Sequence, residues 1–365
     1  MGVMEDRKRR HKKNAFHKGR IVLVVVFAIL LVLFSYVYIK VYRGESKDIP
    51  IIGKFISKIV HQEEDKSLKV LNPDSNARPY AVMINNHPDA RRYHSGLQEA
   101  YLTYEIIVEG GMTRLMAVYK GVDVGKIGSV RSSRHYFLDY ALENDAVYVH
   151  WGWSPMAQSD IRNLGVNNIN GLNYEGTYFY RDRSLPIALE HTGFTDTERI
   201  QKGIKNLGYR NTTGKDILLN YSIDEIDMSA LTGAIVANNV TINYSSSITT
   251  SYKYDENEKV YYRSVNGVAH KDYVTGKQYT VKNIIVYQVA NHTLPGDDKG
   301  RQDIDNLGSG EGYLISDGYA VPINWSKSSR SAQTVYTYLD GTEITVNDGN
   351  TYIQIQPKGR NLSIE

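Results

Sequence analysis

Charged side chains of both signs recur in one short part of the sequence. The two acids and three bases there are Glu105, Glu109, Arg114, Arg131 and Arg134. Two carboxylates about 5–9.5 Å apart can cleave a glycosidic bond. Arginines instead bind carboxylates and phosphates in a bidentate manner. The residue types therefore allow either a carboxylate pair or an anion site, and the elements that carry them decide between the two.

A Gly-Gly pair separates two alternating segments, 102–109 and 113–120, which predicts a β-hairpin. With the glycines as a two-residue turn, Glu105 and Glu109 share one face of the hairpin with Arg114. At about 3.3 Å per residue the two carboxylates lie about 13 Å apart, which is too far for a hydrolase pair. Two interpretations stay open, a structural ion network or one wall of a polar ligand cleft.

The segment 128–134, Gly-Ser-Val-Arg-Ser-Ser-Arg, precedes a predicted helix at 135–143 with Ser132 or Ser133 as its N-cap. Two arginines and the free N–H groups of a helix N-terminus can bind an anion. That anion is either a carboxylate or phosphate of an envelope polymer, or one of the two hairpin glutamates.

His150 ends a predicted strand at 146–150, and Trp151 follows it. Ligands gather at the carboxyl ends of strands in parallel α/β sheets. A tryptophan can stack on a sugar ring and His150 can transfer a proton, although Trp151 packed beneath the sheet is the alternative. Asp182, within an Arg-Asp-Arg run, is a further candidate for the same cleft.

Aspartates cluster at 297–305, before a glycine-rich run at 308–312. Their spacing is not that of an EF-hand loop, so a turn-rich β-connection is the alternative to a cation site. The glycine run lacks the Gly-Lys-Ser/Thr of a phosphate loop, and the sequence has neither a His-Glu-x-x-His zinc helix nor a Gly-x-Ser-x-Gly elbow. The absence of cysteine excludes disulfides and thiolate metal sites. No metal ligand and no cofactor is predicted, while both interpretations of the aspartates at 297–305 stay open.

The N-terminal residues predict a membrane anchor. Residues 1–20 hold eight Lys/Arg and two acids, and residues 21–39 form a run of nineteen residues without a charge. A helix of about 20 residues crosses a bilayer core of ~30 Å. The run is longer than the apolar core of a cleaved signal peptide and lacks a small-residue cleavage site. We therefore predict a retained signal anchor with a basic cytoplasmic tail and everything from about residue 40 outside the cell.

The charge outside the basic tail argues against a nucleic-acid partner. The whole chain carries 43 Lys+Arg and 40 Asp+Glu, but residues 21–365 hold 35 basic and 38 acidic residues. The exterior part therefore has no basic footprint. The expected partners are the membrane, crossed once, and peptidoglycan or another wall polymer, or cell-wall proteins.

The exterior part divides into three segments by pattern. Residues 40–76 are polar with a short amphipathic stretch, which predicts a stalk or linker. Residues 77–220 mix strands with capped helices, and residues 235–360 alternate and are rich in Asn-Gly and Asp-Gly turns. We predict an α+β fold with a mixed α/β first domain and a mostly antiparallel β second domain.

Five motifs resemble the YerB-like family of bacterial envelope proteins, found mainly in Gram-positive bacteria and usually lipoproteins. They are RPYAVMINN at 78–86, EGGMTR at 109–114, IGSVRSSR at 127–134, GSGEG at 308–312 and WSK at 325–327. The resemblance extends over about residues 70–360. It implies a two-domain envelope protein and carries no established activity.

The chain departs from that family in two places. Family members are typically held by a lipidated cysteine, whereas here the predicted membrane helix takes its place. The family usually carries a Pro-His-Asn-like motif after Arg181-Asp182, whereas here Pro186 is followed by Ile-Ala-Leu and His191 comes later.

These features predict a non-catalytic envelope protein that binds a wall component or a partner protein through a polar cleft. The cleft would comprise Glu105, Glu109, Arg114, Arg131, Arg134 and His150. The alternatives are an envelope hydrolase or transferase in which Glu109 is the base and the arginines hold the substrate, and a scaffold for cell-wall enzymes. In a folded chain these side chains either converge on an open pocket or satisfy each other beneath the surface.

Overall fold

The computed structural model describes residues 27, 31, 34–36, 38, 39 and 67–365. The chain forms two compact units, Met1–Ser67 and Leu68–Glu365. The predicted anchor at 21–39 and the predicted stalk therefore lie largely outside the described residues. Within those residues, no helix is long and apolar enough to cross a bilayer.

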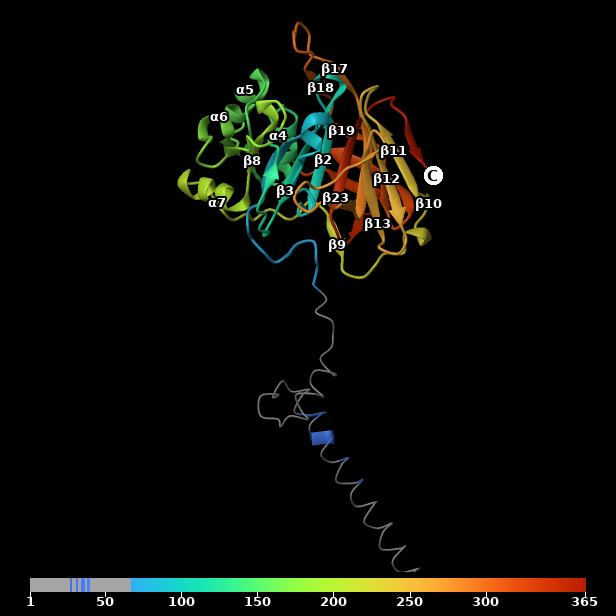
Figure 1. The fold of residues 1–365 in the computed structure, drawn as a ribbon. Helices are drawn as coiled ribbons and strands as arrows, with labels where there is room; N and C mark the ends of the chain where they lie inside the picture. The colour runs from blue at the N-terminus through green and yellow to red at the C-terminus, as the bar shows by residue number, and fades with distance from the viewer. Residues whose placement is uncertain (1–26, 28–30, 32–33, 37, 40–66) are drawn as a thin grey trace, which may run out of the picture. The chain divides into compact units, whose positions relative to one another are not determined.

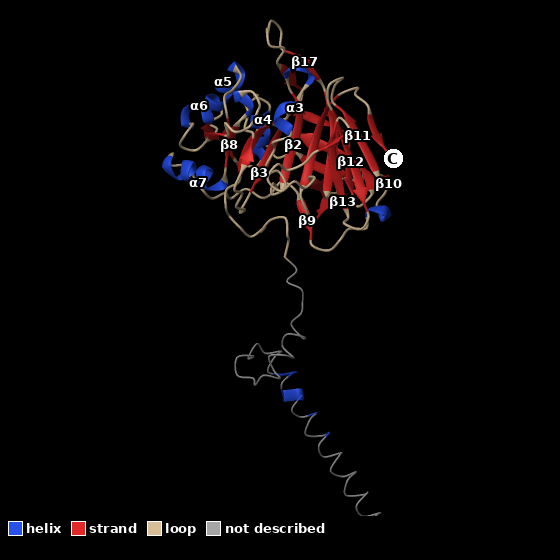
Figure 2. Cartoon of the chain, viewed as in Figure 1, coloured by secondary structure: helices blue, strands red, loops and turns tan. Residues whose placement is uncertain are grey.

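The second unit, here called the body, is mostly β-structure with a few short helices (Figure 2). The α+β prediction therefore overstated the helical content. The longest helix of the body is α7 (Thr197–Asn206). The helices α4 (Phe137–Glu143) and α5 (Pro155–Asn163) are shorter.

One large sheet contains strands from both halves of the chain, in the order β10-β20-β19-β16-β23-β2-β3-β1-β5-β6, with β21 paired to β20. Its strands are β1 (Tyr80–Asn85), β2 (Leu102–Ile107), β3 (Thr113–Tyr119), β5 (Val147–His150), β6 (Asn168–Asn170), β10 (Ile235–Val236), β16 (Asn283–Val289), β19 (Gly308–Ser316), β20 (Tyr319–Lys327), β21 (Val335–Tyr338) and β23 (Thr351–Pro357). The parallel pair β2 and β23 joins residues about 250 apart in sequence. The two predicted domains thus share a sheet.

A second, antiparallel sheet of six strands lies over part of the large one (Figure 1). It consists of β11 (Asn239–Asn243), β12 (Thr249–Asp255), β13 (Val260–Val265), β14 (Val268–Ala269), β15 (Thr280–Val281) and β24 (Leu362–Ile364). Buried and less buried residues alternate along β11 and β13, as in strands that face a core on one side. By contrast, β1, β2 and β3 are buried at every position, which explains their continuous apolar runs.

The remaining elements are short. They are α3 (Pro88–Arg91), α6 (Gly171–Tyr174), β4 (Ile127–Gly128), β7 (Tyr180–Arg181), β8 (Gly193–Thr195), β9 (Asn220–Ser222), β17 (Asn291–Thr293), β18 (Gln302–Ile304), β22 (Thr345–Asn347) and the 3-10 turns Glu109–Gly111, Leu189–His191 and Met228–Ala230. Ser154 caps α5 by accepting the N–H of Ala157, and Pro155 follows at the first helical position. The N-cap predicted for α4, Ser132 or Ser133, was wrong, because α4 begins after Tyr136 without a side-chain cap. Asp196 caps α7 by accepting the N–H of Arg199.

The hairpin exists as predicted, but its register differs by one residue. Glu109–Gly111 form a 3-10 turn in which both glycines have φ of 68°, so the connection is longer than a two-residue turn. Ile106, and not Ile107, therefore faces Arg114 across the strands. Because a one-residue shift exchanges the two faces of a strand, Glu105 lies on the opposite face of the sheet from Arg114.

Candidate functional site

The loops that carry most of the predicted site residues meet along one edge of the large sheet. The strands β6, β5, β1, β2, β23 and β16 all run in the same direction. The loops after β1, β2, β5 and β6 therefore lie together at what we call the carboxyl edge. Open sheets with parallel strands bind ligands at this edge.

Glu109, Arg114 and Arg134 form an ion triad at the carboxyl edge. Arg134 Nε donates to Glu109 Oε2 at 2.9 Å and Arg114 Nη2 donates to Oε1 at 3.0 Å, while Arg134 Nη2 donates to Oε1 as well. Burial alone would raise the pKa of Glu109, but the two arginines outweigh it and lower the pKa to about 2. A carboxylate held in this way is a weak base at neutral pH.

Arg131 lies beside the triad in a more open environment. Its Nη2 donates to Glu190 Oε1 at 3.0 Å, and the Glu190 side chain is 59% exposed, against 26% for Arg131. An exposed pair of this kind contributes about 0–1 kcal/mol to stability. A ligand anion can therefore replace the Glu190 carboxylate on Arg131 at small cost.

Glu105 does not belong to this edge cluster. On the opposite face of the sheet its carboxylate accepts from Arg263 Nη2 at 2.7 Å, and both side chains are fully buried. Thr113 and Thr250 also donate to the same carboxylate, at 2.8 Å and 3.1 Å. Since β13 supplies Arg263, this buried ion pair joins the first half of the chain to the second, as an internal network and not as part of an open cleft.

A chain of hydrogen bonds leads from Arg263 back to the end of β1. Arg263 Nη1 has only protons to give, so His270 Nδ1 accepts from it, and His270 Nε2 then donates to His94 Nδ1 at 2.8 Å. His94 Nε2 in turn donates to the carbonyl oxygen of Asn85. Both imidazoles are neutral in this arrangement, consistent with burial lowering their pKa values, that of His94 to about 3.

His150, Trp151 and Asp182 are engaged by the protein itself. His150 is fully buried, its Nδ1 contacts the Gly152 carbonyl at 2.7 Å, and burial lowers its pKa. Trp151 is 7% exposed, and the Arg181 guanidinium lies 4.2 Å from its ring centroid, which matches the alternative of a packed tryptophan. Asp182 pairs with Lys126 at 2.8 Å. The polar groups of His150 and Asp182 are therefore already paired within the protein.

A group that the sequence did not single out lies at the same edge: His87, Asp89 and His191. Their ligating atoms all lie within 4.8 Å of one another. However, His191 Nδ1 accepts from the Asn85 amide at 2.7 Å and His87 Nδ1 accepts from the N–H of Asp89 at 3.3 Å. Each neutral imidazole then carries its proton on Nε2, so neither ring has a free lone pair for a metal.

The ring geometry of the same group also disfavours a metal. The two imidazoles stack with centroids 4.7 Å apart and an interplanar angle of 13°. Lone pairs lie in the ring planes, so parallel stacked rings do not direct them toward one point. The group instead offers N–H donors beside Arg131. Burial is the largest cause of the lowered pKa of His191, and the neighbouring His87 and Arg131 lower it further. The pairing of residues 87 and 191 carries no local sequence signal, because their loops meet only in the folded chain.

The aspartates at 297–305 are also used internally. Asp297 pairs with Arg301 at 2.8 Å and Asp303 with His135 at 2.7 Å. These contacts fit the β-connection that we gave as the alternative to a cation site, since β17 and β18 form a hairpin here. In Figure 1 this hairpin projects from the body at the end opposite the first residues of the body.

Known proteins resemble this chain in sequence and in structure. Residues 68–210 match "Protein of unknown function (DUF3048) N-terminal domain", and residues 240–353 match the C-terminal domain of the same family. The chain is 32% identical over 294 residues to "Putative lipoprotein YerB" of Bacillus subtilis (strain 168), which covers 80% of this chain and 84% of that protein. The crystal structure of YerB protein from Bacillus subtilis matches with a TM-score of 0.68 and 30% identity, over 79% of this chain and 94% of that chain.

Proposed function

Because the chain belongs to the DUF3048 family, and its Bacillus subtilis relative is named as a lipoprotein, we propose that it is a membrane-anchored, extracytoplasmic envelope protein that binds an anionic wall polymer at the carboxyl edge. The apolar run at 21–39 would hold this protein in the membrane, in place of the lipid that the relative's name implies. The basic residues before the run would keep the N-terminus in the cytoplasm.

The observation that carries the binding proposal is the excess of N–H donors at the carboxyl edge. In α3, the ion triad and the Arg131 pair, five arginines are set against three acids: Arg91, Arg92, Arg114, Arg131 and Arg134 against Asp89, Glu109 and Glu190. Arg131 is the member best placed to bind a ligand, because its partner Glu190 is exposed and replaceable. A phosphate or carboxylate of a wall polymer would take the place of that carboxylate and accept from Arg131 and the Nε2–H of His191.

The geometry gives less support to a hydrolase or transferase that uses Glu109 as its base. A general base works best with a pKa near the working pH, whereas that of Glu109 is lowered to about 2. Deprotonating a substrate would also require Glu109 to leave two arginines that are each 7% exposed. We therefore give Glu109 a positioning role, since it fixes Arg114 and Arg134 next to Arg131.

Retention of the full chain, in detergent micelles, on purified cell-wall sacculi tests this proposal. Arg131→Ala is expected to weaken retention about tenfold or more, since a hydrogen bond to a charged group contributes about 1.5–3 kcal/mol. Arg162→Ala is the matched control, because Arg162 is an exposed arginine on α5 without an ion pair among the described residues. Equal retention of the Arg131→Ala variant and the wild type would refute the proposal, and soluble fragments released from the wall would indicate the hydrolase instead.

A further inference from the structure

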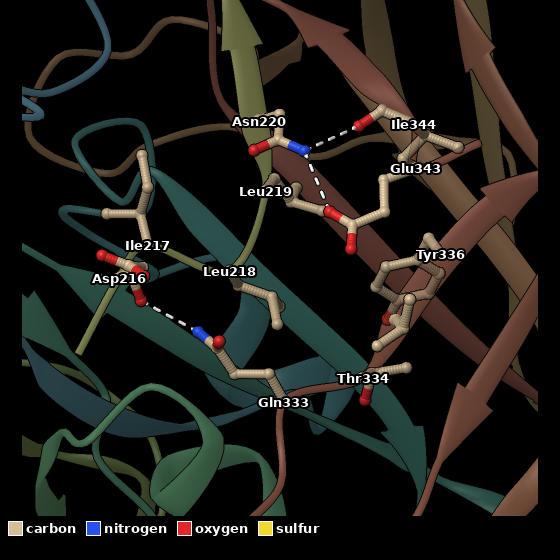
Figure 3. Close-up of a pocket in the computed structure, with 11 residues that line it drawn as sticks. Asp216, Ile217, Leu218, Leu219, Asn220, Gln333, Thr334, Tyr336, Glu343 and Ile344 are labelled. Atoms are coloured by element: carbon tan, nitrogen blue, oxygen red, sulfur yellow. Dashed lines mark hydrogen bonds between the residues drawn. The ribbon is translucent and has the colours of Figure 1, made fainter.

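The pocket shown in Figure 3 lies away from the carboxyl edge, between the segment 216–220 and the start of β21. Its charged groups are the exposed carboxylates of Asp216 and Glu343. The Tyr336 hydroxyl is buried and interacts with other side chains of the core. Two exposed carboxylates select no particular ligand. The carboxyl edge, by contrast, holds a group in which imidazoles, acids and an arginine meet.

The stacked rings of His87 and His191, here called the imidazole pair, lie directly beside the arginine that would bind the wall anion. His191 Nε2 is 3.8 Å from Glu190 Oε1, the oxygen that also accepts from Arg131 Nη2 at 3.0 Å. The two ring centroids are 4.7 Å apart. An anion that replaced the Glu190 carboxylate would therefore lie next to His191 and within about 10 Å of the His87 ring, which is close enough for charges to interact at 0.1 M salt or less.

The inner member of the pair, His191, resists protonation. It is 5% exposed, and its Nδ1 accepts from the Asn85 amide at 2.7 Å. The orientation of that amide is fixed, because Asn85 Oδ1 accepts the backbone N–H of His87 at 3.2 Å. A proton on His191 Nδ1 would meet the amide N–H group of Asn85. Burial also lowers the pKa of His191, as do His87 and Arg131.

The outer member, His87, is placed to take up a proton. Its side chain is 44% exposed, and an imidazole in contact with water changes charge between about pH 5 and pH 8. Its Nδ1 lies 3.6 Å from Asp89 Oδ2, so this carboxylate would accept from the protonated ring. The charged groups around the pair are Asp89 and Arg92 at α3, Arg131 from the segment 128–134 and Glu190 from the 3-10 turn. Two acids face two bases, so an added anion leaves a negative excess that a proton on His87 would neutralise.

From this arrangement we propose that the carboxyl edge is an acid-strengthened anion site, in which the binding of a phosphate or carboxylate is coupled to the uptake of a proton by His87. The inference rests on the wall-binding proposal, since it concerns the same anion on Arg131. As the pH falls from about 7.5 to 5.5, the imidazolium adds a positive charge to the site. The protein would therefore hold its wall ligand more tightly in an acidic envelope than in a neutral one.

Ligand-observed NMR on the full chain in detergent micelles tests the coupling with two probes. Glycerophosphoglycerol carries a phosphodiester and N-acetylalanine a carboxylate, and both stay ionised between pH 5.5 and pH 7.5. Dissociation constants are measured at these two pH values in about 20 mM salt, where charges are weakly screened. At least one probe is expected to bind about threefold more tightly at pH 5.5. The probe that binds identifies the anion.

Variants assign the pH dependence to one residue. His87→Asn keeps a side-chain oxygen that can cap α3 but cannot take up a proton, so this variant is expected to bind the probe equally at the two pH values. His292→Asn is the matched control, because it removes an exposed histidine on β17 and should keep the threefold gain. Arg131→Ala is expected to weaken binding at both pH values.

Failure of this inference and failure of the wall-binding proposal give different results. Equal binding by the wild type at the two pH values, or a gain that His87→Asn retains, would overturn the coupling and leave the anion site in place. If neither probe binds at either pH, the anion site itself is refuted and the coupling with it.

Discussion

The buried pair of Glu105 and Arg263 gives the sharpest test of how the two halves of the chain are held together. Glu105→Gln keeps the shape of the side chain and removes its charge. Arg263 would then be a buried cation without a counter-ion, since both side chains are 0% exposed and His270, its other partner, is neutral. Breaking a buried ion pair by removing one partner costs about 3–5 kcal/mol.

Urea unfolding at pH 7, followed by tryptophan fluorescence, measures this loss. For a body of this size, the same loss of free energy corresponds to a fall in melting temperature of roughly 10 °C in a thermal unfolding experiment. Glu190→Gln is the control, because it removes a 59% exposed carboxylate from a surface pair and should change the free energy of unfolding by less than about 0.5 kcal/mol.

A second variant separates the unpaired charge from simple loss of packing. In Glu105→Leu combined with Arg263→Met neither charge remains, so the double variant should be more stable than Glu105→Leu alone. A loss below about 1 kcal/mol for Glu105→Gln, or a double variant no more stable than Glu105→Leu, would show that the buried pair does not hold the two halves of the chain together.

Three further outcomes are expected. Glu109→Gln should lower the free energy of unfolding by about 1–2 kcal/mol because two arginines lose their shared carboxylate. If the variant instead keeps the melting temperature of the wild type and loses a cellular phenotype, that result favours a catalytic glutamate. Burial lowers the pKa of His94 to about 3, so below about pH 6.5 the unfolded chain takes up a proton that the folded chain does not. The free energy of unfolding should therefore fall as the pH is lowered, by about 2 kcal/mol at pH 5. Urea midpoints at pH 7 and pH 5 test this, and His94→Asn should reduce the difference between them. Gly193→Ala should destabilise by about 1–3 kcal/mol, since its Cβ would lie 2.6 Å from the Trp151 ring; a melting temperature equal to the wild type would contradict this packing.

Local patterns in the sequence were sufficient for the strands and for the family. The apolar run 81–84 lies within β1, which is buried on both faces, and Ser154-Pro155 begins α5 as its capping chemistry requires. The motif-based resemblance to the YerB-like family is confirmed by both family domains and by the YerB relative. These features follow from residues within a few positions of each other, so a single sequence carries them.

Tertiary structure decided how the charges are partnered. Glu105 and Glu109 are four residues apart, yet Glu105 pairs with Arg263 in the core and Glu109 with Arg114 and Arg134 at the edge. A one-residue change in the hairpin turn separates them, because it exchanges the faces of the strand. No local pattern marks Arg263 as the partner of a residue 158 positions away. Whether a charge is free to bind a ligand or is already neutralised depends on contacts that form only when distant strands join one sheet.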